Sequence, residues 1–336
     1  MNTIDFTLCI PTYNSEKTLQ CTLNSIQNQK FDRNKIEVLI IDGGSTDKTL
    51  EIANTYNFVK IIKNEKRLPE FAKLIGINNA RGKYFTIIDS DESFAHNNVL
   101  NERLMAFQQF PSAHLLVADK LNYVKGFGVS GHYLNICGDP FTWFIYKNKH
   151  GVLNTFTKNI SKQYTENNIK INLLTFKDGE KRPIADGGTT TYDLNFLKQN
   201  YSNQMTNIEF VTAMSDNILN KSNNCLCIKG DDIFHRSKSQ LRTYLKKIRF
   251  RIVNNVFMPT ESGFSSRTVS KTNKKFLFPL YTLSFVLPLF DSIKMSIEYK
   301  NISMMLHIFY TYYTTTLIML YMLLKIFGIK KQNKEY

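Results

Sequence analysis

The sequence predicts an α/β protein with a doubly wound, mostly parallel sheet, followed by an apolar helical region near the C-terminus. Two observations predict the sheet: short runs of β-branched and aromatic residues alternate with helical stretches, and several of these runs end in polar residues. The third observation is that residues 276–328 are the most apolar part of the chain. With 336 residues, the chain is long enough for one large domain or two modest domains with real cores.

The predicted strands are five β-type runs with helical stretches between them. The first helical stretch places its apolar side chains on one face, with Asn14 or Ser15 as the expected N-cap. The second stretch begins at Ser45, which is its expected N-cap. The five runs span residues 7–11, 37–42, 58–63, 83–89 and 114–119, and the first helical face consists of Leu19, Leu23 and Ile26.

Three predicted strands end in polar residues, at 11–14, 42–45 and 89–91. In doubly wound sheets, ligands bind at the carboxyl ends of the strands. The stretch YFTIIDSDES (84–93) finishes a buried strand with Asp89 and Asp91, and this pair can be a solvated turn, a helix cap or a cation site. Alternation along a strand would point both carboxylates to the same side. Because three polar turns share one edge, we favour the cation site.

The net charge of +15 is concentrated toward the C-terminus. Residues 236–275 contain eleven Lys or Arg and one acid, Glu261, directly before the apolar region. This order is typical of contact with anionic lipid headgroups, with nucleic acid as the competing partner. Since no recognition helix, zinc-finger spacing or RNA-binding aromatic motif accompanies the basic block, we expect no nucleic-acid partner.

The five cysteines have no regular spacing, which fits a reducing compartment. Cys225 and Cys227 are expected to be buried thiols, because no second pair of metal ligands exists. The N-terminus lacks the basic and apolar regions of a signal peptide. We therefore expect residues 1–235 to be cytoplasmic.

Two apolar segments, residues 276–290 and 304–324, predict membrane-associated helices between Lys-rich flanks. The first segment contains two prolines, so a re-entrant or interfacial helix is an alternative to a span, and a soluble helical pair is the alternative for both. Residues 236–275 form the predicted interfacial segment, in which apolar residues recur at helical spacing among basic ones. Residues 329–336 form a basic tail, and the expected location is the cytoplasmic face of the cell membrane. The recurring apolar residues are Leu241, Leu245, Ile248 and Ile252.

Three linked motifs resemble the N-terminal half of the family 2 glycosyltransferases, which have the GT-A fold. They are PTYNSEKTL (11–19), EVLIIDGGSTDKT (37–49) and NNARGKYFTIIDSDE (78–92). The later stretches IADGGTTTYDLNFL, AMSDNILN and IKGDDIFHRSKSQLRTYLKK are similar, more loosely, to the acceptor half of that family. The resemblance implies inverting transfer of a sugar from a nucleotide-diphosphate donor. It also implies that residues 1–120 bind the donor and residues 121–235 bind the acceptor.

For the donor, the resemblance assigns Asp91 to a divalent cation and Asp89 to the ribose or a metal-bound water. A departing nucleoside diphosphate gains negative charge, which Mg²⁺ or Mn²⁺ held by carboxylate oxygens neutralises. Asp42 should accept from the base or ribose, or else form an Asx-turn ahead of Gly43. The remaining expected donor residues are Pro11, Thr12, Tyr13, Glu16, Lys73 and Ser90, with Arg81 as a further candidate beside Lys73.

For the acceptor, an inverting transfer needs a general base beside the attacking hydroxyl. The resemblance assigns this role to Asp216, although an aspartate before a helix is also an ordinary N-cap. Asp139, Asp186 and Glu209 are reserve candidates. His235 is assigned to the metal or a phosphate, with a satisfied strand histidine as the alternative, and Trp143 is expected in the core rather than against a sugar.

These assignments predict a metal-dependent inverting glycosyltransferase at the cytoplasmic membrane face. Its donor would be a nucleotide-diphosphate sugar and its acceptor a saccharide or a polyprenyl-linked lipid, in the synthesis of cell-surface polysaccharide or glycolipid. The alternative is a non-catalytic, membrane-associated subunit that binds nucleotide sugar or assists assembly.

Overall fold

The computed structural model describes residues 3–183, 189–237, 239–259 and 272–329. The chain divides into two compact units. Unit 1 comprises Met1–Asn122 and Gly151–Arg236, and unit 2 comprises Tyr123–His150 and Ser237–Tyr336. The predicted boundaries within residues 1–235 remain predictions.

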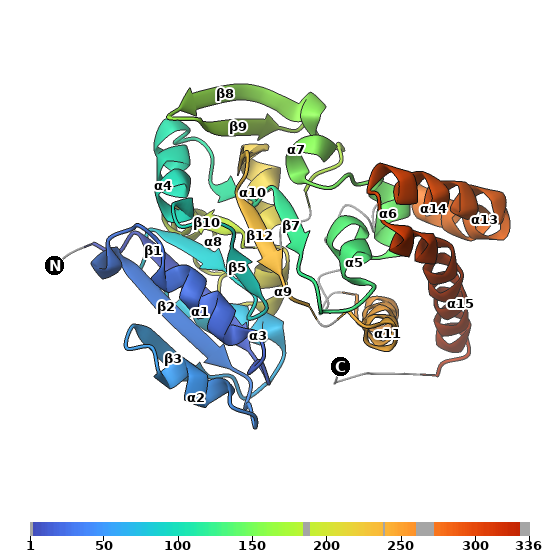
Figure 1. Ribbon diagram of the computed structural model, residues 1–336, viewed down its shortest axis with the longest axis horizontal. Helices are drawn as coiled ribbons and strands as arrows, with labels where there is room; N and C mark the ends of the chain where they lie inside the picture. The colour runs from blue at the N-terminus through green and yellow to red at the C-terminus, as the bar shows by residue number, and fades with distance from the viewer. Residues whose placement is uncertain (1–2, 184–188, 238, 260–271, 330–336) are drawn as a thin grey trace. The chain divides into compact units, whose positions relative to one another are not determined.

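Unit 1 contains a large α/β sheet, which confirms the predicted fold class (Figure 1). Within the described residues its strand order is β3-β2-β1-β4-β10-β6-β11-β9-β8. The first four positions form a continuous parallel ladder, and β10 is antiparallel to both β4 and β6. The strands are β1 (Phe6–Thr12), β2 (Ile36–Asp42), β3 (Val59–Lys63), β4 (Tyr84–Ile87), β6 (Leu115–Leu116), β8 (Ile160–Glu166), β9 (Ile169–Thr175), β10 (Thr191–Asp193) and β11 (Asn224–Ile228).

Helices cover both faces of this sheet. The alternate side chains of β2 enter two different cores: Val38 and Ile40 enter one, Leu39 and Ile41 the other. A strand buried on both faces reads as a continuous apolar run, and IEVLIID is such a run. The first core includes side chains of α1 (Leu19–Gln27), α2 (Thr49–Asn54) and α4 (Val99–Gln109), and the second those of α3 (Pro69–Asn79), α8 (Leu194–Tyr201), α9 (Ile208–Thr212) and α10 (Met214–Ser222).

The element boundaries differ from the predicted ones where turns replace regular structure. The run at 83–89 is a strand only through Ile87, and the run at 114–119 is one only at Leu115–Leu116. The predicted N-caps are wrong, because α1 begins after Thr18 and α2 after Lys48. The polar residues expected to cap them bind across the two loops instead, as described below.

A second, three-stranded sheet has the order β5-β12-β7. Its strands are β5 (Glu92–Phe94), β12 (Asp232–His235) and β7 (Lys120–Tyr123). β5 follows the predicted cation-site turn directly, and β12 pairs with it antiparallel. This small sheet therefore brings the end of unit 1 back to the residues after β4. Three short helices complete unit 1: η1 (Arg33–Lys35), α7 (Val152–Thr155) and η2 (Thr157–Asn159).

After β7, the described residues of unit 2 form helices and connecting loops. The third hydrophobic core of the chain lies in unit 2 and combines residues of both chain segments of that unit. It includes the buried Trp143, so the expected core position of this residue is confirmed. Its helices are α5 (Gly131–Cys137), α6 (Pro140–Tyr146), α11 (Leu241–Phe257), η3 (Asn273–Leu277), α13 (Phe278–Leu283), α14 (Val286–Glu298), η4 (Ile302–Met305) and α15 (Leu306–Ile326).

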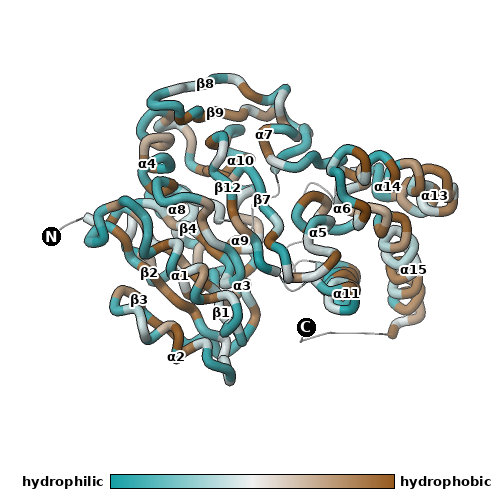
Figure 2. The backbone as a smooth tube through the Cα atoms, in the orientation of Figure 1, coloured by the Kyte–Doolittle hydropathy of each residue, from teal (hydrophilic) through white to brown (hydrophobic). Residues whose placement is uncertain are grey.

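The structure does not show the expected membrane association of the C-terminal helices, which stays a prediction. Among the described residues, no single helix is both long and apolar enough for a bilayer span. α15 has 21 residues, but its Thr, Tyr and His side chains lower its mean hydropathy (Figure 2). The segments Asn273–Leu283 and Val286–Glu298 pass the length and composition criteria only as a pair, bent by 92°.

The apolar stripe of α11, the helix expected at the membrane interface, is mostly buried within the protein. Ile248 and Ile252 of α11 are 2% and 8% exposed, and α11 packs against α15 within unit 2. Leu241 is the most exposed of the four stripe residues, at 39%. The stripe therefore serves mainly to hold α11 in the helical core.

Candidate active site

Asp42 closes a tight turn at the carboxyl end of β2. Its Oδ2 atom accepts hydrogen bonds from the backbone N–H groups of Gly44 and Ser45, both at 2.9 Å. Its Oδ1 atom accepts from the Ser45 hydroxyl and, at 3.3 Å, from Thr12 Oγ1. The side chain has the Asx-turn geometry left open by the sequence. A direct contact from Asp42 to a nucleotide remains a prediction. The turn holds the Asp42 carboxylate in one position at the end of β2.

The loop after β1 is tied to the loop after β2 by side chains on both. Asn14 has a φ of 49°, and its Oδ1 atom accepts from the backbone N–H of Thr46 at 2.9 Å. The backbone N–H of Glu16 donates to Asp47 Oδ2 at 3.1 Å. Burial alone would raise the pKa of Asp47, but hydrogen bonds from Thr49 and the Glu16 backbone lower it overall. Pro11 lies within β1, and Tyr13, the residue that follows β1, is 49% exposed at the sheet edge where ligands bind in doubly wound folds.

The turn that carries Asp89, Ser90 and Asp91 lies outside any strand. β4 ends at Ile87, so the expected strand alternation does not orient the two aspartates. The turn is held from α1 and from the loop before it: Thr22 of α1 donates to the Ser90 carbonyl at 3.1 Å, and Ser90 Oγ lies 2.7 Å from Ser15 Oγ in the loop. The positions of the two carboxylates are therefore set by this turn and by the strand that follows it.

Glu92 is the buried partner of this turn, and the sequence interpretation missed it. Its side chain accepts from the backbone N–H of Asp89 at 3.1 Å. Burial raises the pKa of Glu92 well above its ordinary value, and the negative charges of Asp89 and Asp91 raise it further. Hydrogen bonds from the Asp89 and Thr189 backbones act in the opposite direction. Three neighbouring carboxyl groups thus disfavour one another's ionised forms, and a cation placed among them would favour those forms.

β12 brings His235 to the same locus. His235 is paired with Glu92 in the β5–β12 ladder, and its Nε2 atom lies 3.6 Å from Asp91 Oδ2. The backbone N–H of Arg236 donates to the Asp91 carbonyl at 2.7 Å. The two predicted metal residues, one from each chain segment of unit 1, are therefore adjacent.

The residues at this locus fit a divalent cation of the predicted kind. Asp91 offers a carboxylate oxygen, the ligand type that Mg²⁺ and Mn²⁺ prefer, whereas the imidazole nitrogen of His235 suits Mg²⁺ poorly. The described residues contain no cluster of three or more His, Cys, Asp or Glu with metal-site geometry. Mg²⁺ sites in phosphoryl enzymes use one or two carboxylates together with substrate phosphates, so two protein ligands are compatible with this chemistry.

Lys73 of α3 lies near the same edge. Burial raises the pKa of the Cys9 thiol to about 12; the positive charge of Lys73 acts against this rise and the negative charge of Asp89 adds to it. Cys9 on β1 is thus within electrostatic range of both predicted donor residues. Arg81 points elsewhere, since its Nε atom pairs with Glu37 Oε1 at 2.6 Å near the beginning of β2.

Asp216 lies in the first turn of α10, where a carboxylate suits the helix dipole. It is not the N-cap, because that position belongs to Ala213. α10 continues from α9, and α9 packs against α3, the helix that carries Lys73. Its role as the base remains a prediction.

The three reserve candidates for the general base lie in different parts of the chain. Asp139 belongs to unit 2, where it caps α6 by accepting from the Thr142 backbone at 2.9 Å. Glu209 lies in the first turn of α9, and Asp186 lies outside the described residues. Cys225 and Cys227 are fully buried free thiols, as expected.

Comparisons with known proteins find a family model and several relatives that are similar to this chain. The model of the family described as "Glycosyl transferase family 2" matches residues 7–183. The Bacillus subtilis protein named "Minor teichoic acid biosynthesis protein GgaA" is 29% identical over 208 residues, which cover 54% of this chain and 46% of that protein. The Staphylococcus aureus "Poly(ribitol-phosphate) beta-N-acetylglucosaminyltransferase TarS" is 30% identical over 129 residues, 37% of this chain and 22% of that protein. The matched regions thus span less than half the length of these two relatives.

One solved structure extends the fold comparison over nearly the whole chain. It is the "Mannosyltransferase PcManGT from Pyrobaculum calidifontis in complex with GDP-Man and Mn2+", with a TM-score of 0.55 and 13% sequence identity. The match covers 98% of this chain and 88% of that one. At this identity the likeness shows the fold.

Proposed function

Because this chain belongs to glycosyltransferase family 2 and is an enzyme of that family, we propose that it transfers a sugar from a nucleotide-diphosphate donor in a metal-dependent, inverting reaction. One observation carries the proposal. Asp91 and His235 lie 3.6 Å apart beside Asp89 and the buried Glu92, after the carboxyl end of β4. The "GDP-Man and Mn2+" bound to the mannosyltransferase of similar fold supports this choice of ligands.

The roles of the donor residues follow from their positions. Asp91 and His235 would hold the cation, and Asp89 would accept from the ribose or a metal-bound water. When bound, a divalent cation neutralises the negative charge that develops on the diphosphate leaving group. Tyr13 offers an exposed aromatic face for the base. The remaining donor wall comprises Pro11, Thr12, Glu16, Asp42, Lys73 and Ser90.

For the acceptor, we assign the general base to Asp216. The base must take a proton from the attacking hydroxyl as the new glycosidic bond forms on the face opposite the leaving group. The acceptor class we propose is a saccharide or a polyprenyl-linked lipid at the cytoplasmic membrane face, in cell-surface polysaccharide synthesis. The printed names of the Bacillus and Staphylococcus relatives, which concern teichoic acid and poly(ribitol phosphate), support a surface polymer.

Nucleotide-dependent stabilisation tests the donor site. The thermal midpoint of the full chain would be measured with UDP, GDP, dTDP or CMP, each with and without Mn²⁺. We expect one nucleoside diphosphate to raise the midpoint only when Mn²⁺ is present, and Asp91→Asn to abolish the shift. Asp178→Asn is the matched control, because that side chain is 96% exposed.

Asp91→Asn must also be shown to fold. The thermal midpoint and the circular dichroism spectrum of Asp91→Asn without nucleotide show whether the variant folds like the parent. If no nucleotide shifts the midpoint of the folded parent, the donor assignment is wrong. The alternative, a non-catalytic nucleotide-sugar-binding subunit, predicts that Asp216→Asn changes neither binding nor turnover, whereas we expect turnover to be lost and binding retained.

A further inference from the structure

The charge of the protein is divided unequally between its two units. Unit 2 contains 19 of the 43 Lys and Arg residues but only 5 of the 28 Asp and Glu residues. It therefore carries +14 of the net charge of +15, and unit 1 is nearly neutral. A strongly cationic unit attracts an anionic surface, and this attraction has no counterpart in the sugar-transfer part of the chain.

Two helices of unit 2 expose the side chains that a water-soluble helix would bury. The outward side chains of α13, α14 and the turn between them are large and apolar, and six of them are 54–72% exposed. Figure 2 shows these helices as largely hydrophobic. Contiguous apolar surface of this kind marks an interaction site. We call it the apolar face, and its six residues are Leu280, Leu283, Phe285, Val286, Phe290 and Ile297.

The inward side of the same helices combines apolar side chains, such as Phe278 and Met295, with polar ones that are hydrogen-bonded to α15 or to their own helix. Thr282 Oγ1 lies 2.7 Å from Thr315 Oγ1, and both side chains are buried. Ser292 accepts from the Ile308 backbone at 3.1 Å and donates to the Pro288 carbonyl at 2.7 Å. Thr282 and Ser292 thus have partners inside the protein, as lipid requires, because lipid offers no water to polar atoms.

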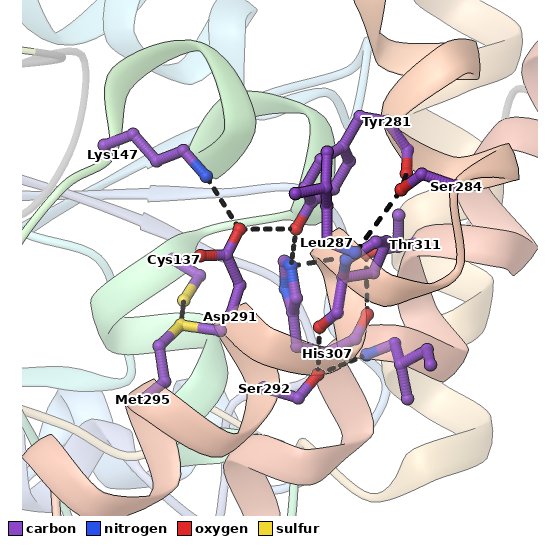
Figure 3. Close-up of polar contacts among 12 residues, drawn as sticks. Cys137, Lys147, Tyr281, Ser284, Leu287, Asp291, Ser292, Met295, His307 and Thr311 are labelled. Atoms are coloured by element: carbon purple, nitrogen blue, oxygen red, sulfur yellow. Dashed lines mark hydrogen bonds and ion pairs between the residues drawn. The ribbon is translucent and has the colours of Figure 1, made fainter.

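A charged group near the helices is also neutralised internally. Asp291 of α14 accepts from Lys147 Nζ at 2.9 Å and from the Tyr281 hydroxyl at 2.8 Å (Figure 3). The Tyr281 hydroxyl also lies 2.9 Å from His307 Nε2, and His307 Nδ1 lies 2.6 Å from the Tyr133 hydroxyl. The one acid within this helix pair before Glu298 is thus tied to a cation of the same unit, which reduces the cost of placing it near lipid.

The dimensions of the pair favour insertion into one leaflet. α14 has 13 residues, a length of about 20 Å, whereas a hydrocarbon core is about 30 Å thick. The pair bends by 92° between α13 and α14, and exposed lysines stand before it, within α14 and after it. These cations suit lipid phosphates on the side from which the helices enter. They are Lys274, Lys294 and Lys300.

We propose that the apolar face of α13 and α14 inserts into one leaflet of an anionic lipid bilayer and does not cross it. The inference deepens the membrane part of the proposed function and rests on it for the cellular setting. The charge of unit 2 selects lipid over a second copy of this chain, because two copies would bring two units of +14 together.

Phe285, at the turn between the two helices, provides a variant that separates membrane binding from folding. Its φ is 55°, in the left-handed region that favours glycine, and its ring is 54% exposed. Phe285→Gly should therefore maintain or raise the thermal midpoint while removing an aromatic side chain from the apolar face. A loss of vesicle binding by this variant could not be attributed to unfolding.

Vesicle flotation of the full chain tests the proposal, with phosphatidylcholine vesicles that contain or lack phosphatidylglycerol. We expect binding that phosphatidylglycerol strengthens, roughly tenfold or more weaker binding for Leu283→Glu/Val286→Glu, and weaker binding for Phe285→Gly. Val129→Glu is the matched control, since Val129 is 59% exposed in unit 2 outside the apolar face. Its vesicle binding should match that of the parent. The glutamate pair should keep its nucleotide-dependent thermal shift, so a failure of lipid binding and a failure of the donor assignment are distinguishable.

Equal vesicle binding by the parent and the glutamate pair would overturn the proposal. A lipid-free dimer that the pair converts to a monomer without changing vesicle binding would also overturn it, and would identify the face as a contact between copies. Cysteine labelling tests the single leaflet, in a Cys21→Ser background because Cys21 is an exposed thiol. Lys274→Cys and Lys300→Cys should both react with a membrane-impermeant maleimide added outside vesicles; reaction of only one would show that the pair crosses.

Discussion

Arg103 and Asp231 form an ion pair in which both side chains are completely buried, with Nε 2.8 Å from Oδ2 and Nη2 2.9 Å from Oδ1. The other guanidinium N–H groups donate to the Thr189 carbonyl, the Thr189 hydroxyl and the Thr191 hydroxyl. All five donors of the arginine are thus used. The pair joins α4 to the turn before β12, the strand that carries His235.

Removal of one partner of this pair should be strongly destabilising. Arg103→Met leaves a buried carboxylate without its cation, and the expected loss in free energy of unfolding is about 3–5 kcal/mol. Urea denaturation followed by circular dichroism measures it. Lys63→Met is the control, because the Lys63–Glu65 pair is 75% and 79% exposed, and its loss should be about 1 kcal/mol or less. Comparable losses in the two variants would contradict the role given to Arg103.

Gly76 has a packing role that a double substitution can isolate. A Cβ atom at this position would lie 2.3 Å from Cys9 Sγ, so Gly76→Ala should reduce the free energy of unfolding by about 1–3 kcal/mol. Cys9→Ala removes the clashing sulfur. The double variant Gly76→Ala/Cys9→Ala should therefore be more stable than the sum of the single effects predicts, and urea denaturation of all four proteins gives the coupling energy. Additive losses would place the strain elsewhere.

Asp193 should stabilise the protein at neutral pH and lose that effect in acid. It caps α8 by accepting from Asn195 and Phe196, and its Oδ2 atom lies 3.0 Å from His114 Nδ1. Burial raises the pKa of Asp193, but bonds from His114, Phe196 and Asn195 lower it overall. Its stabilisation is thus present above the unfolded value near 3.9 and is lost as pH falls through the lower folded value.

Asp193→Ala should cost about 1 kcal/mol at pH 7, measured by urea denaturation. The difference between variant and parent should shrink at pH 3. A difference that is unchanged between the two pH values would mean that the carboxylate charge contributes nothing to the cap.

His307 should make the protein sensitive to mild acid. Burial lowers its pKa to about 3, with Asp291 acting to raise it and Lys147 to lower it. Since the unfolded chain gains a proton near the ordinary value of 6.5, stability is present above that pH and is lost as pH falls from 6.5 toward 3. The loss between pH 6.5 and 5.5 should be about 1 kcal/mol.

His307→Gln, a neutral replacement, should remove that dependence. The thermal midpoints of parent and variant, measured from pH 7.5 to pH 5, give the comparison. Parallel curves for the two proteins would show that His307 does not titrate differently in the folded and unfolded states.

The sequence predicted the elements that local patterns specify. The runs of β1 and β2 are mostly apolar and are buried on both faces, and the apolar residues of α1 recur at helical spacing and are buried on one face. The cluster around Asp91 was predictable in part because linked motifs stood at strand ends. The proximity of His235 was predictable only through the resemblance, since the β5–β12 pairing that produces it is non-local.

Other features depend on contacts that a single sequence does not reveal. Glu92 reads as one more acid after Asp91, and its burial is visible only when β12 covers it. Arg103 reads as a surface residue of α4, yet five acceptors surround it in the fold. The basic periodicity of α11 suggested a membrane contact, but Ile248 and Ile252 are used for packing on α15. In each case a distant chain segment decides the environment.

The place of β10 in the sheet determines the order in which the protein can fold during synthesis. β10 lies between β4 and β6, although it follows β6 in the chain by more than seventy residues. When a ribosome has released residues 1–122, the parallel ladder β3-β2-β1-β4 can assemble, but β6 has neither of its partners. The nascent chain must therefore hold an open edge at β4 until residues 191–228 emerge. A chaperone that binds exposed strand edges would have its greatest effect in this interval.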